Sequence, residues 1–277
     1  MTALARRPDR AMQQQPGAVA VKWDALGGPP RPEALEGADA VVHLSGEPIA
    51  SGRWTEERKR KILESRIHGT QNLLHALSQC DETPKVLISG SATGFYGARG
   101  DEILDEESPP GQGFPADVAM QWEREAQKAQ AHNVRVVLLR TGIVLSAQGG
   151  ALPRMSLPFR MFVGGPLGSG RQWVSWIHIQ DEVEIIRLAL SDERVEGPIN
   201  LTAPQPVTNR EFSSQLGRVL KCPSLLPVPA FALRLLLGEM AQALLLEGQR
   251  VLPRQLQALG YSFRYPGLEA ALRNLLE

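Results

Sequence analysis

The chain has 277 residues, of which 43% are hydrophobic and 22% are charged, so it can bury the core of one large domain or of a domain with a smaller lobe. Thirty basic residues balance thirty acidic ones, which argues against a nucleic acid or an acidic membrane surface as partner. Its two cysteines, Cys80 and Cys222, lie far apart and in no metal-ligand spacing, as in proteins of a reducing compartment. We expect a soluble, cytoplasmic protein that handles a small molecule and holds no metal.

Three short stretches near the amino end have strand character. Thr2 to Ala5 reads as the end of a strand, followed by a turn through Arg10. Residues 19–23 and 40–46 are apolar runs of strand type, the second ending in small residues. The connection over 27–32 is rich in turn residues and has room for little more than a helical turn.

A long helix is predicted after the third of these strands. Thr55 is a good N-cap, with Glu56 and Glu57 at the positive end of the helix dipole, and the helix should run to about Leu77. Its buried stripe is predicted to comprise Ile62, Ile67, Leu73, Leu74 and Leu77.

Residues 85–97, KVLISGSATGFYG, read as a buried strand that ends in a site. An apolar run is followed by glycines and hydroxyl side chains, and open parallel sheets bind their ligands at the carboxyl ends of strands. We therefore predict that Ser91, Thr93 and Tyr96 carry function. The alternative is a Ser/Gly-rich turn after a core strand.

Strands and helices continue to alternate after this stretch. Residues 101–113 are acidic and rich in Pro and Gly, which predicts a surface loop, and Pro115 can open a helix over 116–131. Residues 135–144 form another buried strand. This order predicts a parallel sheet with helices on its faces and right-handed crossovers.

The composition changes after Gly149. Four glycines punctuate residues 158–178, and a helix over 181–190 and a short strand at 199–201 follow. The remainder is mostly helical, with predicted helices at 210–220, 229–246, 253–259 and 268–276. The apolar stretch 229–248 is interrupted by charged residues, so we expect a buried amphipathic helix and no membrane span.

Several of these segments together resemble the extended short-chain dehydrogenase/reductase superfamily, in its epimerase/dehydratase branch. RIHGTQNLL at 66–74 resembles the pattern N-V-x-G-T-x-N-L-L, with Arg66 in place of Asn, and SGSATGFYG resembles S-S-x-x-V-Y-G. More specifically, SGEPIASGRW, PFRMFVGGPLGSGRQWVSWIH and LLLEGQRVLPRQLQALGYSF are similar to the YfcH-like epimerase family group, which carries a small C-terminal domain.

The resemblance implies a doubly wound, Rossmann-like α/β domain over residues 1–150. Substrate-side segments and a small helical lobe would occupy 151–277. It also implies NADP(H) as cofactor, because Arg6 and Arg7 follow the strand at which such proteins read the adenosine ribose, and a basic residue there accommodates a 2′-phosphate. The alternative for this pair is a solvated basic turn. The other cofactor-binding residues implied are Leu44, Ser45, Gly46, Arg66 and Ser89, with Ile143 and Val144 beside the nicotinamide.

The chain departs from the family pattern at its beginning. The family starts with a strand and a G-x-x-G-x-x-G loop that seats the pyrophosphate, whereas the earliest glycine here is Gly17. We expect cofactor affinity to fall severely, and we expect a gap in the sheet where the central strand would lie. Our hypothesis is that the sequence is a truncated or mis-started gene product.

A second departure concerns the catalytic pair Tyr-x-x-x-Lys. The corresponding helix offers Phe114, Val118 and Trp122, none of which moves a proton. Chemistry would then depend on the three candidates at 91, 93 and 96. The resemblance adds substrate contacts from Glu47, Arg160, Trp176 and His178. The alternative for His178 is a structural histidine with satisfied hydrogen bonds, and for Trp176 it is packing in the core. For Glu47 the alternative is a position on a surface loop.

These residues leave three functions open. The first is an NADP(H)-dependent oxidoreductase or epimerase acting on a small polar substrate. The second is a non-catalytic dinucleotide-binding or interaction protein, for which plastid members of the group suggest a role in division. The third is an inactive fragment without a phosphate loop. The oligomeric state does not follow from the sequence.

Overall fold

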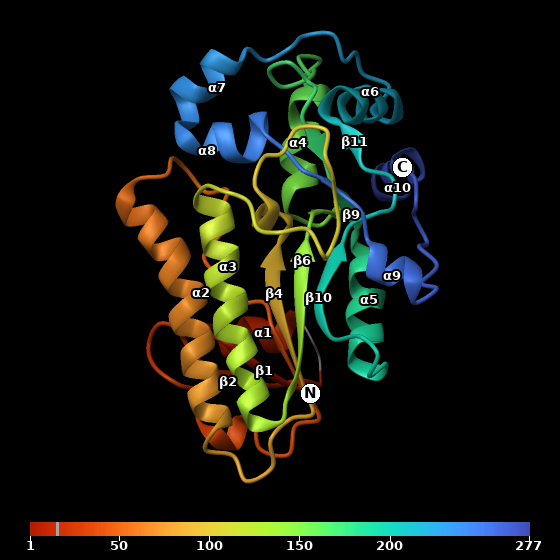
Figure 1. Cartoon of the computed structure of the whole chain (residues 1–277). Coiled ribbons are helices and arrows are strands. Elements are labelled where there is room, and N and C mark those ends of the chain that lie inside the picture. The colour runs from red at the N-terminus through yellow and green to blue at the C-terminus, as the bar shows by residue number, and fades with distance from the viewer. Residues whose placement is uncertain (15–16) are drawn as a thin grey trace.

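A computed structural model describes residues 1–14 and 17–277 of the chain. Its main sheet has four parallel strands in the order β10-β6-β4-β3, and it runs vertically through the centre of Figure 1. These strands are β3 (Ala40–His43), β4 (Val86–Ala92), β6 (Arg135–Thr141) and β10 (Gly197–Leu201). The predicted Rossmann-like α/β fold is confirmed.

Helices cover both faces of this sheet (Figure 1). On one face, α2 (Glu56–Leu77) and α3 (Phe114–Gln127) lie side by side. On the other face, Ile185 and Ala189 of α5 (Ile179–Ser191) belong to one buried cluster with Ile88 of β4 and Val137 of β6. Helix α2 begins and ends where the sequence predicts, because the Thr55 side chain accepts a hydrogen bond from the backbone N–H of Arg58 at 3.1 Å.

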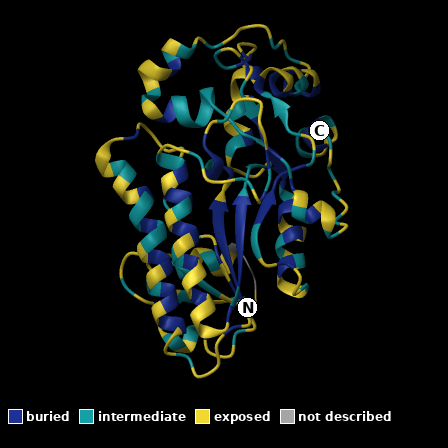
Figure 2. Cartoon of the chain, viewed as in Figure 1, coloured by how far each residue is buried: buried dark blue, intermediate teal, exposed yellow. Residues whose placement is uncertain are grey.

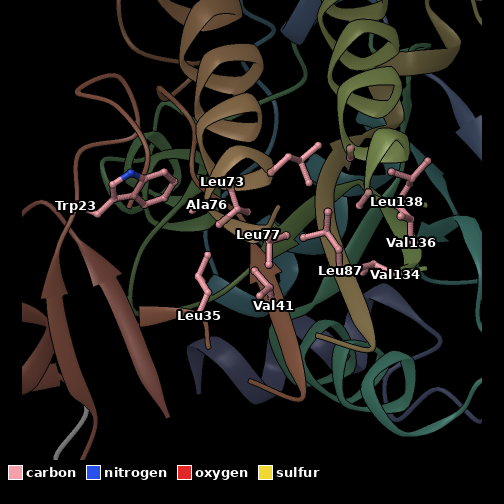
Figure 3. Packing of buried hydrophobic residues seen from close by; sticks show 13 residues of the cluster. Trp23, Leu35, Val41, Leu73, Ala76, Leu77, Leu87, Val134, Val136 and Leu138 are labelled. Atoms are coloured by element: carbon pink, nitrogen blue, oxygen red, sulfur yellow. The ribbon is translucent and has the colours of Figure 1, made fainter. Parts of the chain in front are cut away.

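The core between α2 and the sheet is an apolar cluster (Figure 3). Leu73 and Leu77 of α2 belong to one cluster with Val41 of β3 and Leu87 of β4. Figure 2 shows the central strands as the most deeply buried part of the molecule. Burial of such side chains contributes about 1.5–3 kcal/mol each, so this layer fixes the strands that carry the candidate site.

The first two strands stand apart from the main sheet. β1 (Thr2–Ala5) and β2 (Val19–Lys22) form a parallel pair of their own, joined by α1 (Pro8–Gln14). Among residues 1–14 and 17–277, no strand pairs with the second edge of β1 or of β3. The predicted gap in the sheet is therefore present. The prediction of a turn through Arg10 was wrong, because Pro8 and Asp9 favour a helix start there.

The acidic segment 101–113 is not simply a surface loop. It contains β5 (Ile103–Leu104), which pairs with β12 (Arg250–Val251) near the carboxyl end of the chain. Leu104 is completely buried. This two-residue pairing ties the segment to the C-terminal region.

The strand predicted over 135–144 is interrupted at Gly142. Residues beyond it form β7 (Ile143–Leu145), which pairs with β9 (Trp176–His178) instead of continuing β6. A Cβ at Gly142 would lie 2.5 Å from the carbonyl oxygen of Ser175. The close backbone approach explains why glycine stands at this break.

The remaining elements are short, and of these α4, α6 and β11 lie in the upper part of Figure 1. They are the 3-10 helices η1 (Pro32–Ala34), η2 (Thr93–Tyr96) and η3 (Lys128–His132), the strands β8 (Trp173–Val174) and β11 (Val207–Thr208), and the helices α4 (Ala151–Arg160), α6 (Asn209–Leu220), α9 (Arg254–Ala258) and α10 (Leu268–Leu276).

The single buried helix predicted over 229–246 does not form. The segment divides into α7 (Ala230–Leu237), α8 (Glu239–Ala241) and a π-helical turn, Gln242–Leu246, because Gly238 adopts a left-handed conformation (φ 64°) that ends the helix. In α7, Phe231, Leu235 and Leu236 are exposed. In the part of the chain that the structure covers, no helix is both long and apolar enough to cross a membrane.

A buried carboxylate holds the C-terminal segment against the main domain. Asp181, in the first turn of α5, accepts hydrogen bonds from the backbone N–H groups of Arg264 at 2.8 Å and Tyr265 at 3.0 Å. It also accepts one from the Tyr261 hydroxyl at 3.2 Å. Asp181 is almost fully enclosed, so these bonds compensate for its burial.

Replacing Asp181 with Ala should lower the free energy of unfolding by about 2–4 kcal/mol, because buried donors lose their acceptor. Urea unfolding measures this loss. Glu184→Ala is the matched control on the same helix, since Glu184 is exposed, and it should change stability by less than about 0.5 kcal/mol. Equal losses in the two variants would contradict the role given to Asp181.

Candidate functional site

The candidate site lies at the carboxyl edge of the main sheet. Ser91 of β4 stands opposite Arg140 of β6, and Ala92 stands opposite Thr141. Residues 44–46 follow β3 at the same edge, because β3, β4 and β6 are parallel. The sequence therefore placed its central candidates at the edge where such sheets bind ligands.

Ser91 belongs to a buried ion pair network. Its hydroxyl donates to Oε1 of Glu123 at 2.6 Å. The guanidinium of Arg140 donates to both carboxylate oxygens of Glu123 at 2.9 Å, in bidentate geometry. Both charged side chains are only 6% exposed. Burial acts to lower the pKa of Arg140, but the hydrogen bonds and charge of Glu123 outweigh it and hold that pKa above its ordinary value.

Tyr96 is enclosed within the same network. Its hydroxyl donates to Oδ1 of Asn200 at 2.7 Å and accepts from Nη1 of Arg140 at 3.0 Å. The Arg140 guanidinium lies 3.6 Å from the ring centroid of Phe95, a cation–π contact. Burial raises the pKa of Tyr96 to about 12, although Arg140 partly opposes the shift. The phenol therefore stays neutral and holds η2 in place.

The network extends to the segment 101–113 and to the C-terminal region. The backbone N–H of Asn200 donates to Oε1 of Glu106 at 3.0 Å, and its side-chain amide donates to the carbonyl of Leu252 at 3.0 Å. Glu123 and Asn200 were not among the predicted site residues, and Arg140 had no predicted partner. The one available signal was an arginine within the apolar run RVVLLRT, because a buried charge requires a partner.

Thr93 differs from the other two candidates. It begins η2 directly after β4, and its hydroxyl makes no hydrogen bond to any described residue. Its oxygen is not among the fully enclosed unpartnered atoms, so it keeps contact with solvent. Of the three hydroxyls, that of Thr93 is the one without a hydrogen-bond partner among the described residues.

Arg66 and Gly46 are in close contact at the carboxyl end of β3. Nη1 of Arg66 donates to the carbonyls of Glu47 and Ile62, each at 3.0 Å. A Cβ at Gly46 would lie 3.0 Å from Cζ of Arg66. Burial lowers the pKa of Arg66 to about 10, opposed by the charge of Glu47, so Arg66 remains cationic at neutral pH. Arg66, Gly46 and Glu47, all predicted from the sequence to belong to the site, therefore lie together.

The arginines after β1 are available to a ligand. Arg6 and Arg7 are exposed and lie between β1 and α1. Within the described ranges neither makes an ion pair or a side-chain hydrogen bond. Glu47, in contrast, is held by Arg58 at 2.6 Å, and its backbone N–H donates to Oγ of Ser65 at 2.9 Å.

Other predicted residues are enclosed by protein. Nδ1 of His178 accepts from the backbone N–H of Gln180 at 3.0 Å, and Nε2 lies 3.1 Å from Oδ1 of Asn274. Trp176 is fully buried and donates its indole N–H to the Gln205 carbonyl at 3.2 Å. These contacts support the alternatives of a structural histidine and a core tryptophan.

Four further predicted residues, Ser89, Ile143, Val144 and Arg160, lie on three different elements. Ser89 is fully buried and donates weakly to the Gly90 carbonyl at 3.3 Å. Ile143 and Val144 lie half-buried in β7, and Arg160 is exposed at the end of α4. Arg160 makes no hydrogen bond or ion pair with any residue of the Ser91 network among those the structure describes.

Glu182 is a buried acid next to the end of β6. Its Oε1 accepts from the Thr141 hydroxyl at 3.2 Å, and its Oε2 has no partner among the described atoms. Burial raises its pKa from 4.5 to about 8, with the Thr141 bond opposing the shift. Glu182 was not among the residues predicted from the sequence.

Comparison with known proteins gives the family. The NAD dependent epimerase/dehydratase family model matches residues 5–201. The chain belongs to this family. A domain of unknown function (DUF1731) matches residues 228–275. The resemblance stated from the sequence is thereby confirmed.

Individual relatives cover most of the chain. It is 46% identical over 245 residues to the chloroplastic epimerase family protein SDR39U1 homolog of Arabidopsis thaliana, covering 88% of this chain and 70% of that protein. It is 40% identical over 264 residues to epimerase family protein YfhF of Bacillus subtilis, covering 95% and 86%. The structure of human epimerase family protein SDR39U1 (isoform2) with NADPH matches with a TM-score of 0.85 and 35% identity, over 99% of this chain and 90% of that one.

The described residues fit the adenosine 2′-phosphate and the nicotinamide of a dinucleotide, but they do not fit its central pyrophosphate. The exposed arginines after β1 suit a 2′-phosphate, and the carboxyl ends of β3, β4 and β6 suit a nicotinamide. The pyrophosphate requires a glycine turn and a helix N-terminus. Between β1 and β3, the structure has instead a cavity of ≈ 640 Å³.

Replacing Glu123 with Ala should destabilise the protein by about 3–5 kcal/mol, because it leaves the Arg140 charge buried without its partner. Urea unfolding measures the change. Glu125→Ala is the control on the same helix, since its partner Lys128 is exposed, and it should have little effect. A loss below about 1 kcal/mol for Glu123→Ala would show that the network does not hold this edge together.

Glu182 makes the free energy of unfolding depend on pH. Because its folded-state pKa lies above its unfolded value, the contribution of Glu182 to stability is fully present below about pH 4.5 and is lost as the pH rises toward 8. Between pH 6.5 and 8.5 the loss should be about 2 kcal/mol, and Glu182→Gln should remove it. Thermal or urea unfolding at these two pH values measures the slope.

The control for this experiment is Glu184→Gln, on the exposed face of the same helix. It should retain the wild-type slope. An unchanged slope in Glu182→Gln would contradict a buried, protonated carboxyl at this position.

Proposed function

We propose that the protein is a cytoplasmic, NADP(H)-dependent oxidoreductase or epimerase acting on a small polar substrate. This proposal is carried by Arg6 and Arg7, which follow β1, are exposed and make no ion pair with the residues that the structure describes. We assign to them the adenosine side of the cofactor, which proteins of this fold bind after such a strand. The likeness to a human relative whose structure contains NADPH supports the choice of NADP(H) over NAD. Cations at this position favour the 2′-phosphate that distinguishes the two cofactors.

The cofactor would lie along the carboxyl edge. Residues 44–46 would line this edge, with Arg66 beneath them as a fixed positive charge. Ile143 and Val144 of β7 would border the nicotinamide. Ser89, which is buried, would support the floor of the site from within β4.

The substrate would lie beside η2. Since the Ser91 proton is directed to Glu123, the Ser91 oxygen is left to accept a hydrogen bond from a substrate hydroxyl. The Thr93 hydroxyl is free to donate to a substrate oxygen. Tyr96 would position this turn and would not transfer a proton, because its phenol is enclosed. Glu47 and Arg160 are the proposed outer substrate contacts.

A second candidate function is dinucleotide binding without catalysis. It is favoured by the inner face of α3, where Val118 and Trp122 are buried apolar residues and no Tyr-x-x-x-Lys pair occurs in the sequence. Positioning alone can accelerate a hydride transfer, so this observation does not displace the first proposal.

Cofactor selectivity tests the role of the arginines. NADPH should bind at least tenfold more tightly than NADH, because a charge-assisted phosphate contact contributes about 1.5–3 kcal/mol. Titration by fluorescence up to millimolar concentration measures both affinities. Arg6→Ala combined with Arg7→Ala should abolish the preference while leaving NADH binding unchanged.

The control is Arg187→Ala, which removes an exposed positive charge from α5. It should leave the preference intact. Equal affinities for NADPH and NADH in the unaltered chain would contradict the assignment of NADP(H).

Thr93→Val tests the substrate site. It should reduce turnover of a responsive aldehyde or ketone about 10- to 100-fold and leave NADPH affinity unchanged. NADPH oxidation against a panel of small carbonyl compounds measures turnover. NADPH binding with no turnover on any of them would favour the second candidate function.

A further inference from the structure

Glu182 is a buried carboxyl group with a single hydrogen-bond partner among the described residues. It lies in the first turn of α5 and is 8% exposed. Its Oε1 lies 3.2 Å from Oγ1 of Thr141, whereas its Oε2 is fully enclosed and makes no hydrogen bond to any described atom. A buried carboxylate without a cation is costly, so the neutral acid is the favoured form at this position.

The strands packed against α5 bring no charge to this carboxyl group. They are β4, β7 and β9, and within these three described strands His178 is the one titratable side chain. Its Nδ1 accepts from the backbone N–H of Gln180, and its Nε2 lies 3.1 Å from Oδ1 of Asn274. Burial lowers the pKa of His178, so the ring stays neutral near pH 7.

The two charged residues next to this pair in the sequence have partners of their own. Arg140 precedes Thr141 in β6 and therefore points to the opposite face of the sheet, where it is bonded to Glu123. Asp181 precedes Glu182 and is bonded to the C-terminal segment. Burial consequently dominates and raises the pKa of Glu182 to about 8, opposed by the Thr141 hydrogen bond.

Thr141 connects this enclosed acid to the carboxyl edge of the sheet. It is the last residue of β6 and stands opposite Ala92 of β4, which Thr93 follows directly. Two residues beyond it, Ile143 begins β7. Thr141 is half-buried, so this residue reaches the surface of the edge at the level of the proposed substrate and nicotinamide positions.

Reduction of a carbonyl group at this edge requires a proton donor. Tyr96 is enclosed and bonded to Asn200 and Arg140, and the Ser91 hydroxyl donates to Glu123. The inner face of α3 offers the apolar side chains described above. Glu182 is instead an acid that holds a proton at neutral pH and contacts a hydroxyl of this edge.

We propose that Glu182 is the proton source for reduction of the substrate and acts through the Thr141 hydroxyl, an inference that rests on the proposed function. The substrate carbonyl carbon gains a hydride from the nicotinamide dinucleotide, and its oxygen takes the proton of Thr141 Oγ1. The O–H bond of the Glu182 acid breaks as its proton moves to Oγ1. A carboxylate remains, to which water then returns a proton. Oxidation of an alcohol uses the same relay in reverse.

Glu182→Gln tests this relay, because the amide keeps the shape of the neutral acid but has no acidic proton. It should lower kcat for NADPH oxidation with a responsive carbonyl compound by about 100-fold or more at neutral pH, and it should leave NADPH affinity unchanged. In the unaltered protein, kcat should fall above about pH 8, where the acid loses its proton. Glu182→Gln should remove this pH dependence, which a merely structural role would not do.

Two substitutions of Thr141 test the link between the acid and the substrate. Thr141→Val removes the hydroxyl and should produce the same loss of kcat and the same flat pH profile. Thr141→Ser keeps the hydroxyl and should retain most of the activity. The matched control is Glu184→Gln, on the exposed face of α5, which should keep both the rate and the pH profile of the unaltered protein.

Infrared difference spectroscopy measures the protonation of Glu182 without turnover. The carbonyl stretch of a protonated carboxylic acid should be present at about pH 6, diminish toward about pH 9, and be missing in Glu182→Gln. Absence of this band at the lower pH would overturn the relay, as would a Glu182→Gln variant with unchanged kcat and pH profile. If the unaltered protein reduces no carbonyl compound, the proposed function fails and the relay fails with it.

Discussion

The buried ion pair between Arg140 and Glu123 is the interaction on which the candidate site depends. It joins β6 to α3 and fixes the positions of Ser91 and Tyr96 at the end of β4. A charge pair at this depth is costly unless its hydrogen bonds are satisfied. Here Ser91 of β4, Tyr96 of η2 and Arg140 of β6 form hydrogen bonds in one network with Glu123. The same network therefore stabilises the fold and positions the candidate site.

This constraint separates the roles of three hydroxyl groups that look alike in the sequence. Ser91 and Tyr96 are held by charged or amide partners, and the Thr93 hydroxyl makes no hydrogen bond to the residues that the structure describes. Because the network continues through Asn200 to Leu252, the C-terminal segment also supports the site. Asn200 and Leu252, which are far from η2 in the sequence, therefore help to position this four-residue turn.

Local patterns predicted the local features well. The N-cap at Thr55, the buried strand after Lys85 and the order of strands and helices follow from capping chemistry and apolar periodicity. The partners of Ser91 and Tyr96 could not be predicted, because a bidentate contact depends on how β6 and α3 meet in space. The continuous helix expected after Pro229 does not form, because Gly238 has a positive φ of 64° that ends α7. The apolar residues before Gly238 continue the helical pattern, so the sequence did not indicate this break.

The central claim is that a dinucleotide binds along the carboxyl edge between Arg6 and β7. Hydrogen–deuterium exchange with and without saturating NADPH tests it most directly. The account predicts slower exchange in the segments around Arg6, Ser45 and Ile143, and no change in α6 or α10. Unchanged exchange at all three segments, or protection confined to the C-terminal helices, would contradict it.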